Sequence, residues 1–427
     1  MPALDGMRVL DMTQYEAGTS CTQALAWLGA DVVKLERPGT GDPGRGVARG
    51  IDPRPYFLNW NSNKRSVAMD LSKPEGRDLF LELVPRFDVF VENYGPGVIE
   101  KLDIDYPVLR ELHPALIYGR IKGFGLEGPY AHFKSYDMVA QAMGGAFSVT
   151  GFEDGPPIRP GLTVGDAGTG VQMALAITAA FVQRQRTGEG QFIELSMQEA
   201  LTYYMRTVIA NGSEWGASAA PRRGNRSGPG TDLYACKPFG PNDYVYLMVV
   251  TTRQWDTLCA AIDRTDMLTD PRFATEQARL EHAEELREEI AKWTSQHTKH
   301  EAMQILGDGD VPAGATLDTY ELHHDPHLVS RDFVQEAEHP QAGTLRFMGW
   351  PPRMSESKVP IVAAPLLGEH TAEVLGEELG LGDAELAPLI EGGVIAQSDG
   401  PPRATNGAAP AGQAQEEARS AAASRSR

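Results

Sequence analysis

The stretch MRVLDMTQYEAGTSCTQALAWLGADVVKLER, residues 7–37, decides the fold class of this chain. It contains a short apolar run (7–12), a segment with helical spacing of apolar residues (19–28) and a second strand-like run (31–37). The alternation continues with strand-like SVAMDL, DVFVENY and ALIYGRIKGF, separated by helix-like segments at 74–84 and 97–102. Strands that alternate with helices predict a parallel sheet covered by helices on both faces, so we expect an α/β fold.

Motifs that often accompany such a fold are missing. The turn TQYEAGTS after the first strand-like run has a single glycine, Gly18, and therefore lacks the paired glycines of a dinucleotide-binding turn. GTGDPGRG (39–46) is not followed by Lys-Ser or Lys-Thr, which excludes a phosphate-binding P-loop. No GxSxG elbow occurs, which disfavours an α/β-hydrolase. We expect an ordinary strand–helix–strand unit at the N-terminus.

Composition limits the partners of the chain. Its 427 residues suggest about two or three domains. Lys and Arg number 39 against 58 acidic residues, and a net charge of −19 argues against nucleic acid as the main partner. An anionic ligand would therefore need a locally basic pocket.

Cysteine usage and hydropathy indicate a cytoplasmic protein. Cys21, Cys236 and Cys259 show no CxxC spacing, and free thiols suit a reducing cytosol. The N-terminus has no basic stretch followed by an apolar run, so we expect no secretory signal. The longest apolar run, 171–182, is too short to span a bilayer, so we expect no membrane partner.

The later part of the chain contains a bend, a long helix and a second domain. Residues 151–165 are rich in Pro and Gly, and Asp166 opens a long helix-like stretch that ends at Thr187-Gly188. Residues 217–231 have the composition of a mobile loop. LYACKPF and DYVYLMVV then predict a hairpin that opens a smaller domain, and charged helices fill about 275–305.

The HHDPH segment, His323 to His327, is the one group of clustered histidines that resembles a metal clamp. Pro326 would break the helix that an i,i+4 pair of ligands needs, and Asp325-Pro326 has the pattern of a helix N-cap followed by its first residue. We therefore expect no metal site.

Four segments in order are more specific than any of these patterns. They are residues 8–42, NWNSNKRSVAMDLSKPEGRDLF, VENYGPGVIEKL, and GFGLEGPYAHFKSYDMVAQAMGGAFSVTG followed by GDAGTG. In these segments the chain resembles the class III CoA-transferase family, the CaiB/BaiF type, which includes formyl-CoA transferase, carnitine CoA-transferase and α-methylacyl-CoA racemase. The resemblance covers about 200 N-terminal residues and continues to about residue 395.

The resemblance implies a Rossmann-like large domain, a smaller α+β domain and an interlocked homodimer in which two chains thread through each other. On this chain the divisions fall at 1–215 (large CoA-binding domain), 216–231 (glycine-rich loop and linker), 232–330 (small domain), 331–396 (return to the large domain) and 397–427 (disordered tail). The tail lacks aliphatic and aromatic core-forming residues apart from alanine.

The family's transferases use an aspartate nucleophile, which matches Asp166 in VGDAGTG. The implied reaction moves CoA between carboxylic acids through aspartyl anhydride and aspartyl-CoA thioester intermediates, because an anhydride conserves the thioester energy that a serine ester would lose. Taken alone, Asp166 is more simply a helix N-cap; at such a position helix amides would hold it ionised. We expect Gly165, Gly168 and Gly170 to leave room for the thioester.

Further residues are implied for the lid and for CoA, which would be a co-substrate with no tightly bound cofactor. The loop Ser227, Gly228, Pro229 and Gly230 resembles the family's mobile lid; its simpler interpretation is a linker. The CoA-binding positions are Glu16, Ala17, Arg37, Met69, Asp70, Leu71, Ser72, Asn93, Tyr94, Gly95, Lys101, Lys134, Ser135 and Tyr136.

Charge and backbone geometry give these positions a physical basis. Arg37 and Lys101 suit the phosphates of CoA, and residues 93–97 offer backbone amides before a helix. Glu16 stands where the formyl-CoA enzymes carry glutamine, and Ser72 where they carry lysine. The first difference adds a carboxylate near the nucleophile and weighs against formate and oxalate; the second removes a cationic contact.

Three other functions compete with CoA transfer between an acyl-CoA donor and a carboxylate acceptor. The same fold can racemise an α-methylacyl-CoA, but that branch uses a histidine followed by aspartate where this chain has Ser135-Tyr136-Asp137. His132 is the alternative base. A CoA-linked lyase or hydrolase and a non-catalytic CoA-binding protein are the remaining alternatives.

Overall fold

The computed structural model describes residues 1–47 and 55–398. Its large domain is built on a seven-stranded sheet with the order β12-β3-β2-β1-β4-β5-β6. Six strands are parallel, and β12 pairs antiparallel with β3 at one edge. The strands are β1 (Arg8–Met12), β2 (Asp31–Glu36), β3 (Arg65–Met69), β4 (Val89–Glu92), β5 (Ile117–Lys122), β6 (Phe192–Ser196) and β12 (Ile395–Ala396). The predicted parallel α/β sheet is confirmed; the antiparallel edge strand was not expected.

Helices cover both faces of this sheet, because its strands are apolar on both sides. One buried core packs under α1 (Ala17–Trp27), α6 (Asp137–Met143), α8 (Thr169–Thr187) and α9 (Met197–Tyr204). The other lies under α3 (Pro74–Leu83), α4 (Val98–Lys101), α5 (Tyr106–Leu112), α16 (Thr371–Leu379) and α17 (Asp383–Glu391). The order of the six parallel strands, 3-2-1-4-5-6, is that of a doubly wound Rossmann-type sheet.

The small domain has its own core and its own sheet. Strands β7 (Asp232–Ala235), β8 (Tyr244–Leu247) and β9 (Ala313–Ala315) form an antiparallel sheet. Its core includes Tyr234, Trp255 and Leu286. The helices around it are α10 (Thr252–Ala261), α11 (Glu276–Glu281), α12 (Ala283–Thr294) and α13 (Lys299–Asp308). The predicted hairpin and charged helices are confirmed.

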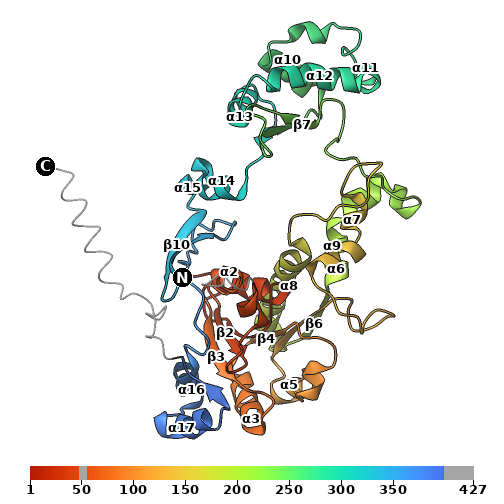
Figure 1. Cartoon of the computed structure of the whole chain (residues 1–427). Coiled ribbons are helices and arrows are strands. Elements are labelled where there is room, and N and C mark those ends of the chain that lie inside the picture. The colour runs from red at the N-terminus through yellow and green to blue at the C-terminus, as the bar shows by residue number, and fades with distance from the viewer. Residues whose placement is uncertain (48–54, 399–427) are drawn as a thin grey trace, which may run out of the picture.

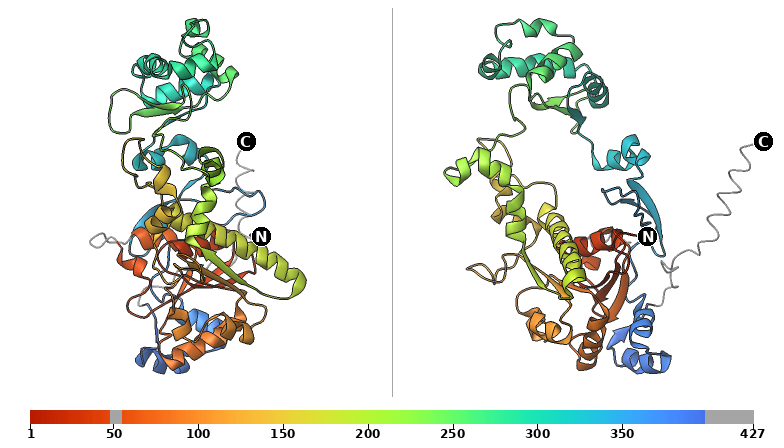
Figure 2. Two further views of the ribbon diagram at one scale, coloured as in Figure 1. Left: turned by 90° about the vertical axis from the view of Figure 1, so that its right-hand side faces the viewer. Right: turned by 180° about the vertical axis from the view of Figure 1, so that it is seen from behind.

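Two separate chain segments join the domains (Figures 1 and 2). The outgoing segment leaves α9 and leads to β7. On the way it lies beside α7 (Ala146–Val149), a short helix from an earlier part of the chain. The returning segment runs on the opposite side of the molecule through α14 (Thr319–His324), α15 (Pro326–Ser330), β10 (Val334–His339) and β11 (Gly343–Met348). The small domain is thereby held away from the large one, with one connection on each side.

The chain end and the HHDPH segment were both subjects of sequence predictions. The predicted tail falls largely on residues 399–427, outside the described residues; Gln397 still hydrogen-bonds to Ala372 and Glu369. Asp325 accepts a hydrogen bond from the Leu328 amide, which confirms the N-cap. Across residues 1–47 and 55–398, no cluster of three potential metal ligands occurs and no helix is long and apolar enough to cross a bilayer.

Candidate active site

The candidate site lies where the order of the parallel sheet reverses. β1 has β2 on one side and β4 on the other, and the chain leaves the carboxyl ends of β1 and β4 toward opposite faces. In doubly wound sheets, ligands bind in the crevice at this point. A cavity of about 260 Å³ opens there and is called the thioester cavity below. Its lining is Gln14, Tyr15, Ala17, Asn93, Tyr94, Gly95, Pro96, Ile121, Lys122, Gly123, Ala131, Phe133, Lys134, Ser135, Tyr136, Asp166 and Met197.

A second cavity of about 200 Å³, called the Arg37 cavity below, lies at the carboxyl ends of β2 and β3. Tyr94 lines both cavities, so the two are neighbours along one edge of the sheet. Arg37 is its exposed cation. The lining is Met12, Leu35, Glu36, Arg37, Met69, Asp70, Leu71, Ser72, Tyr94 and Leu102.

Asp166 lies on a π-type helical turn, Val164–Gly168, directly before α8. The long helix therefore starts at Thr169, later than the sequence indicated. No side-chain cap hydrogen bond forms at either start, so the simple N-cap interpretation of Asp166 is wrong. Its side chain is 8% exposed and reaches the thioester cavity.

Carboxylates surround Asp166. Its backbone amide donates to Oδ1 of Asp137, the first residue of α6, at 3.0 Å. Glu16, 3% exposed, precedes α1 and accepts a hydrogen bond at Oε2 from the Tyr56 hydroxyl at 3.3 Å. Burial, together with the charges of Glu16 and Asp137, raises the pKa of Asp166 to about 8. The expectation that helix amides hold Asp166 ionised is therefore wrong.

The glycines around Asp166 permit close packing of protein against protein. A Cβ on Gly170 would lie 2.0 Å from Oγ of Ser20, and one on Gly165 would lie 2.6 Å from the carbonyl oxygen of Asp137. A Cβ on Gly168 would lie 2.9 Å from the Tyr204 ring. The expected free space for a thioester beside these glycines is wrong, because neighbouring helices fill it. Glycine lets α8 approach α1 at Gly170 and lets the turn Val164–Gly168 approach α6 at Gly165, which brings Asp166 to the cavity.

Most of the predicted CoA positions line the two cavities. The thioester cavity takes Ala17, Asn93, Tyr94, Gly95, Lys134, Ser135 and Tyr136, and the Arg37 cavity takes Arg37, Met69, Asp70, Leu71 and Ser72. Glu16 is buried beside Asp166, and Lys101 is exposed on α4 next to Leu102 of the Arg37 cavity. Neither Glu16 nor Lys101 is among the lining residues of these two cavities.

Several of these groups are already engaged within the protein. The Asn93 side chain accepts from the Gln14 amide (2.7 Å) and donates to the Gln14 carbonyl (2.9 Å). The Tyr94 amide donates to Glu92 at 2.8 Å, so it is not free to bind an anion as expected. Ser72 closes a turn by donating its amide and its hydroxyl to Asp70. These residues shape the cavities through their backbone and their packing.

Sequence reasoning missed Lys122, Tyr15 and Tyr56. Lys122 ends β5, lines the thioester cavity and donates to Glu92 at 3.1 Å and to the Tyr94 carbonyl. A lysine at the carboxyl end of an apolar strand was the available signal. Tyr15 lines the same cavity, and its ring makes an edge contact with Tyr136 at 5.7 Å. No sequence pattern pointed to Tyr56.

The residues predicted to form a lid, 227–230, lie just before the first strand of the small domain. Ser227 donates its amide to the Thr231 carbonyl, and Thr231 donates to the Gly228 carbonyl, which forms a tight turn before β7. Gly230 packs toward Ile290 and Leu286 of the small domain. His132 is exposed and contacts Phe133, but it does not line the thioester cavity.

Comparison with known proteins now decides the family. The model of CoA-transferase family III matches residues 4–371. The chain belongs to CoA-transferase family III. It is 43% identical over 410 residues to formyl-CoA:oxalate CoA-transferase of Streptomyces avermitilis (strain MA-4680), covering 92% of this chain and 99% of that protein. It is 40% identical over 423 residues to the enzyme of that name from Rhodopseudomonas palustris (strain HaA2), with 94% and 98% covered.

Two solved structures have a similar fold. A CAIB/BAIF family protein from Brucella suis superposes with a TM-score of 0.79 at 29% identity, covering 88% of this chain and 99% of that one. A hypothetical protein from Mycobacterium tuberculosis gives 0.75 at 27% identity, with 87% and 99% covered. The recognised family and the enzyme class, a CoA-transferase with CoA as co-substrate, are confirmed.

Proposed function

We propose that this family III enzyme transfers CoA from an acyl-CoA to a carboxylic acid through covalent intermediates on Asp166. The observation that carries the proposal is the position of Asp166, whose buried carboxyl group reaches the thioester cavity at the switch point of the sheet. Among the residues that line this cavity, Asp166 is the one carboxylic acid. A carboxylate nucleophile conserves thioester energy as an anhydride.

The proposed reaction has four balanced steps. An oxygen of the Asp166 carboxylate attacks the thioester carbonyl, and the carbon–sulfur bond breaks to give an anhydride and CoA thiolate. The thiolate attacks the Asp166 carbonyl, which releases the donor acid and leaves an aspartyl-CoA thioester. The acceptor carboxylate attacks that thioester, which forms a second anhydride and frees the thiolate. Thiolate attack on the acceptor acyl carbon then yields the new acyl-CoA and restores the Asp166 carboxylate.

The two cavities suggest how CoA binds. The thioester end belongs in the cavity that Asp166 lines, with Tyr136 and Lys134 at its wall. The phosphorylated end then extends past Tyr94, which lines both cavities, toward Arg37. Lys101 lies one residue from Leu102 and is placed to meet the phosphates from outside the cavity.

The relatives' names support formyl-CoA and oxalate as the first substrate pair to test. Glu16 and Asp137 disfavour oxalate as the acceptor. Oxalate is a dianion, and it would enter a site where these two acidic residues already surround Asp166. A mass-spectrometric screen of acyl-CoAs and carboxylic acids would identify the substrate pair.

An interlocked homodimer is part of the proposal. The two connections between the domains leave the large and small domains as parts of a ring (Figures 1 and 2). The apolar side chains Val171, Leu175 and Val182 are 45%, 71% and 52% exposed along one side of α8. Such a face is typical of an interface between subunits. Because the lid loop starts the small domain, we propose that it closes over Asp166 of the partner subunit.

Trapping tests the nucleophile. Incubation with a productive acyl-CoA followed by hydroxylamine should change the mass of the peptide that contains Asp166. Asp166→Ala should lose essentially all transfer and keep the circular dichroism and CoA affinity of the wild type. A variant that retained near-wild-type transfer would refute the nucleophile assignment.

A further inference from the structure

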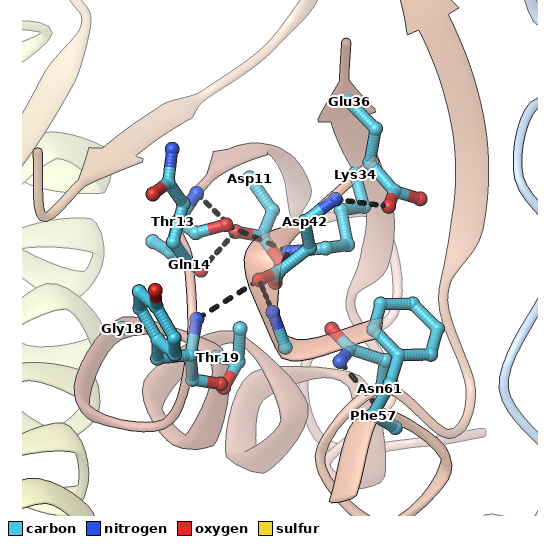
Figure 3. A network of polar contacts seen from close by, with 12 residues as sticks. Asp11, Thr13, Gln14, Gly18, Thr19, Lys34, Glu36, Asp42, Phe57 and Asn61 are labelled. Carbon is cyan, nitrogen blue, oxygen red and sulfur yellow. Dashed lines mark hydrogen bonds and ion pairs between the residues drawn. The ribbon is translucent and has the colours of Figure 1, made fainter. Parts of the chain in front are cut away.

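The loop Thr13–Tyr15 connects β1 to α1 and forms part of the thioester cavity through Gln14 and Tyr15. A side chain binds each of its six backbone polar groups. The pairs are Thr13 N with Asp11, Thr13 O with Lys34, Gln14 N and O with Asn93, Tyr15 N with Asp42, and Tyr15 O with Thr19. Figure 3 shows much of this network. The loop is therefore fixed by groups outside its own backbone.

Lys34 and Asp42 form an ion pair that binds the backbone of this loop. Lys34 is fully buried on β2; its Nζ lies 2.9 Å from Oδ2 of Asp42 and donates to the Thr13 carbonyl at 2.7 Å. Oδ1 of Asp42 accepts from the Tyr15 amide at 3.1 Å and from the Gly44 amide at 2.7 Å. Neither side chain lines the thioester cavity or the Arg37 cavity. The pair therefore reaches the thioester cavity through the backbone groups of Thr13 and Tyr15 that it binds.

The conformation that this pair maintains is an unfavourable one. Tyr15 has φ of 58°, in the left-handed region that residues with a Cβ rarely adopt. In this conformation its ring meets Tyr136 edge-on across the cavity wall, with the ring planes at 88°. The next residue is Glu16, beside Asp166. A change in the Tyr15 backbone would therefore move both the cavity wall and a carboxyl group next to the proposed nucleophile.

We propose that Lys34 and Asp42 are positioning residues that hold Tyr15 in its left-handed conformation and so fix the acyl-transfer side of the cavity. The inference rests on the proposed function. It places the effect on the chemical step, because the Arg37 cavity, where the phosphorylated end of CoA is proposed to bind, includes neither Tyr15 nor Glu16. Positioning errors of about 1 Å can cost on the order of a hundredfold in rate.

The test uses the full-length enzyme and three variants. Asp42→Ala removes both carboxylate oxygens and leaves the buried charge of Lys34 without its ion-pair partner, with the Thr13 carbonyl still accepting its hydrogen bond. Lys34→Met/Asp42→Ala removes both charges, and replacing a buried ion pair by apolar groups often preserves folding. Asp42→Asn keeps an acceptor for the Tyr15 amide. The matched control is Asp88→Ala/Arg184→Met, which removes a partly buried ion pair before β4, at the other end of the sheet.

Two readouts are expected to change together. kcat should fall by about 10- to 100-fold in the double variant, with KM for acyl-CoA and Kd for CoA within about threefold. Amide hydrogen exchange in the peptide spanning residues 13–16 should accelerate at least about tenfold, and less in Asp42→Asn. The control pair should leave both readouts at wild-type values.

A fall in kcat without faster exchange, or faster exchange with unchanged kcat, would overturn the positioning role. Loss of folded protein with normal kcat per folded molecule would also overturn it. If the wild type transfers CoA in no substrate pair, the proposed function fails. Unchanged exchange of the loop amides in the double variant would then separately refute the effect of the pair on the loop.

Discussion

The backbone amide of Asp166 donates to Oδ1 of Asp137 at 3.0 Å, so one acidic side chain directly supports the turn that carries another. Glu16 adds a third acidic group, and burial raises its pKa as well, with the charge of Asp137 acting in the same direction. The nucleophile of the proposed reaction must be ionised, yet its surroundings favour the protonated form. If Asp166 is the nucleophile, we expect the transfer rate to depend on pH.

The first prediction is that kcat/KM for acyl-CoA rises with pH and levels off above about 8, the raised pKa of Asp166. Glu16→Gln removes a charge that raises this pKa, so the midpoint should move to lower pH, and Asp137→Asn should act in the same direction. Stopped assays from pH 5.5 to 9.5 measure the shift. Glu127→Gln, an exposed side chain, is the control and should leave the profile unchanged. An identical midpoint in Glu16→Gln would contradict the electrostatic explanation.

The second prediction concerns stability. The pKa of Asp166 in the folded state, about 8, exceeds its ordinary value of 3.8. The contribution of this group to stability is therefore fully present below pH 3.8, declines as the pH rises and is lost above about pH 8. Asp166→Asn cannot ionise. Its unfolding free energy should match the wild type near pH 4 and exceed it by on the order of a few kcal/mol at pH 8.5. Urea unfolding at the two pH values measures the difference. If the unfolding free energies of the variant and the wild type differed by the same amount at both pH values, the proposed burial of the charge would be contradicted.

The third prediction uses the contact between α1 and α8. Gly170→Ala would place a Cβ 2.0 Å from Oγ of Ser20 and 2.6 Å from the Ala17 carbonyl oxygen. Because a carbonyl oxygen of a helix cannot rotate away, we expect a loss of about 1–3 kcal/mol in stability and a large loss of activity. Gly161→Ala meets no atom within 4 Å and should be neutral in both measurements. Thermal unfolding of the two variants makes the comparison.

The fourth prediction concerns assembly. If two chains are threaded through each other, dissociation requires partial unfolding, so dilution alone should not release subunits. Mass photometry at nanomolar concentration should show one species of twice the chain mass. A folded monomer in that experiment would exclude interlocking, whereas Leu175→Asp should impair assembly, because this side chain is 71% exposed in the single chain.

The fifth prediction separates transfer from racemisation. A racemase needs a base at the α-carbon, and His132, the alternative considered from the sequence, lies outside the lining of the thioester cavity. An α-methylacyl-CoA incubated with enzyme in deuterated water should therefore gain negligible α-deuterium. Deuterium uptake that survives Asp166→Ala and disappears in His132→Ala would favour the racemase.

The sequence predicted five of the six parallel strands, because strand-like runs separated by helix-like segments are a local signal; β6 (Phe192–Ser196), with the sequence FIELS, was not predicted. β12 escaped prediction because Ile395–Ala396 is only two residues long and is defined by its pairing with β3. The small-domain hairpin and the Asp325 cap were also local features, and both were predicted.

The site was predicted in part for the same reason. Arg37 and Asn93 follow apolar strands, so their place at the carboxyl edge could be inferred. The state of Asp166 could not, because its pKa depends on Glu16 and Asp137, which arrive from other elements. Likewise, the role of the glycines in VGDAGTG depends on how closely α1 and α6 pack against this segment, and a local sequence pattern does not predict that distance.

The pairing of β12 with β3 has a consequence for biosynthesis. β3 leaves the ribosome early, but its outer edge is completed by the last described strand, so nearly the whole remaining chain must be translated first. At about 5–20 residues per second, this edge waits unpaired for tens of seconds. During that interval the returning connection has not yet closed the ring on the nascent chain. If two chains interlock as proposed, the partner would thread most easily while translation continues.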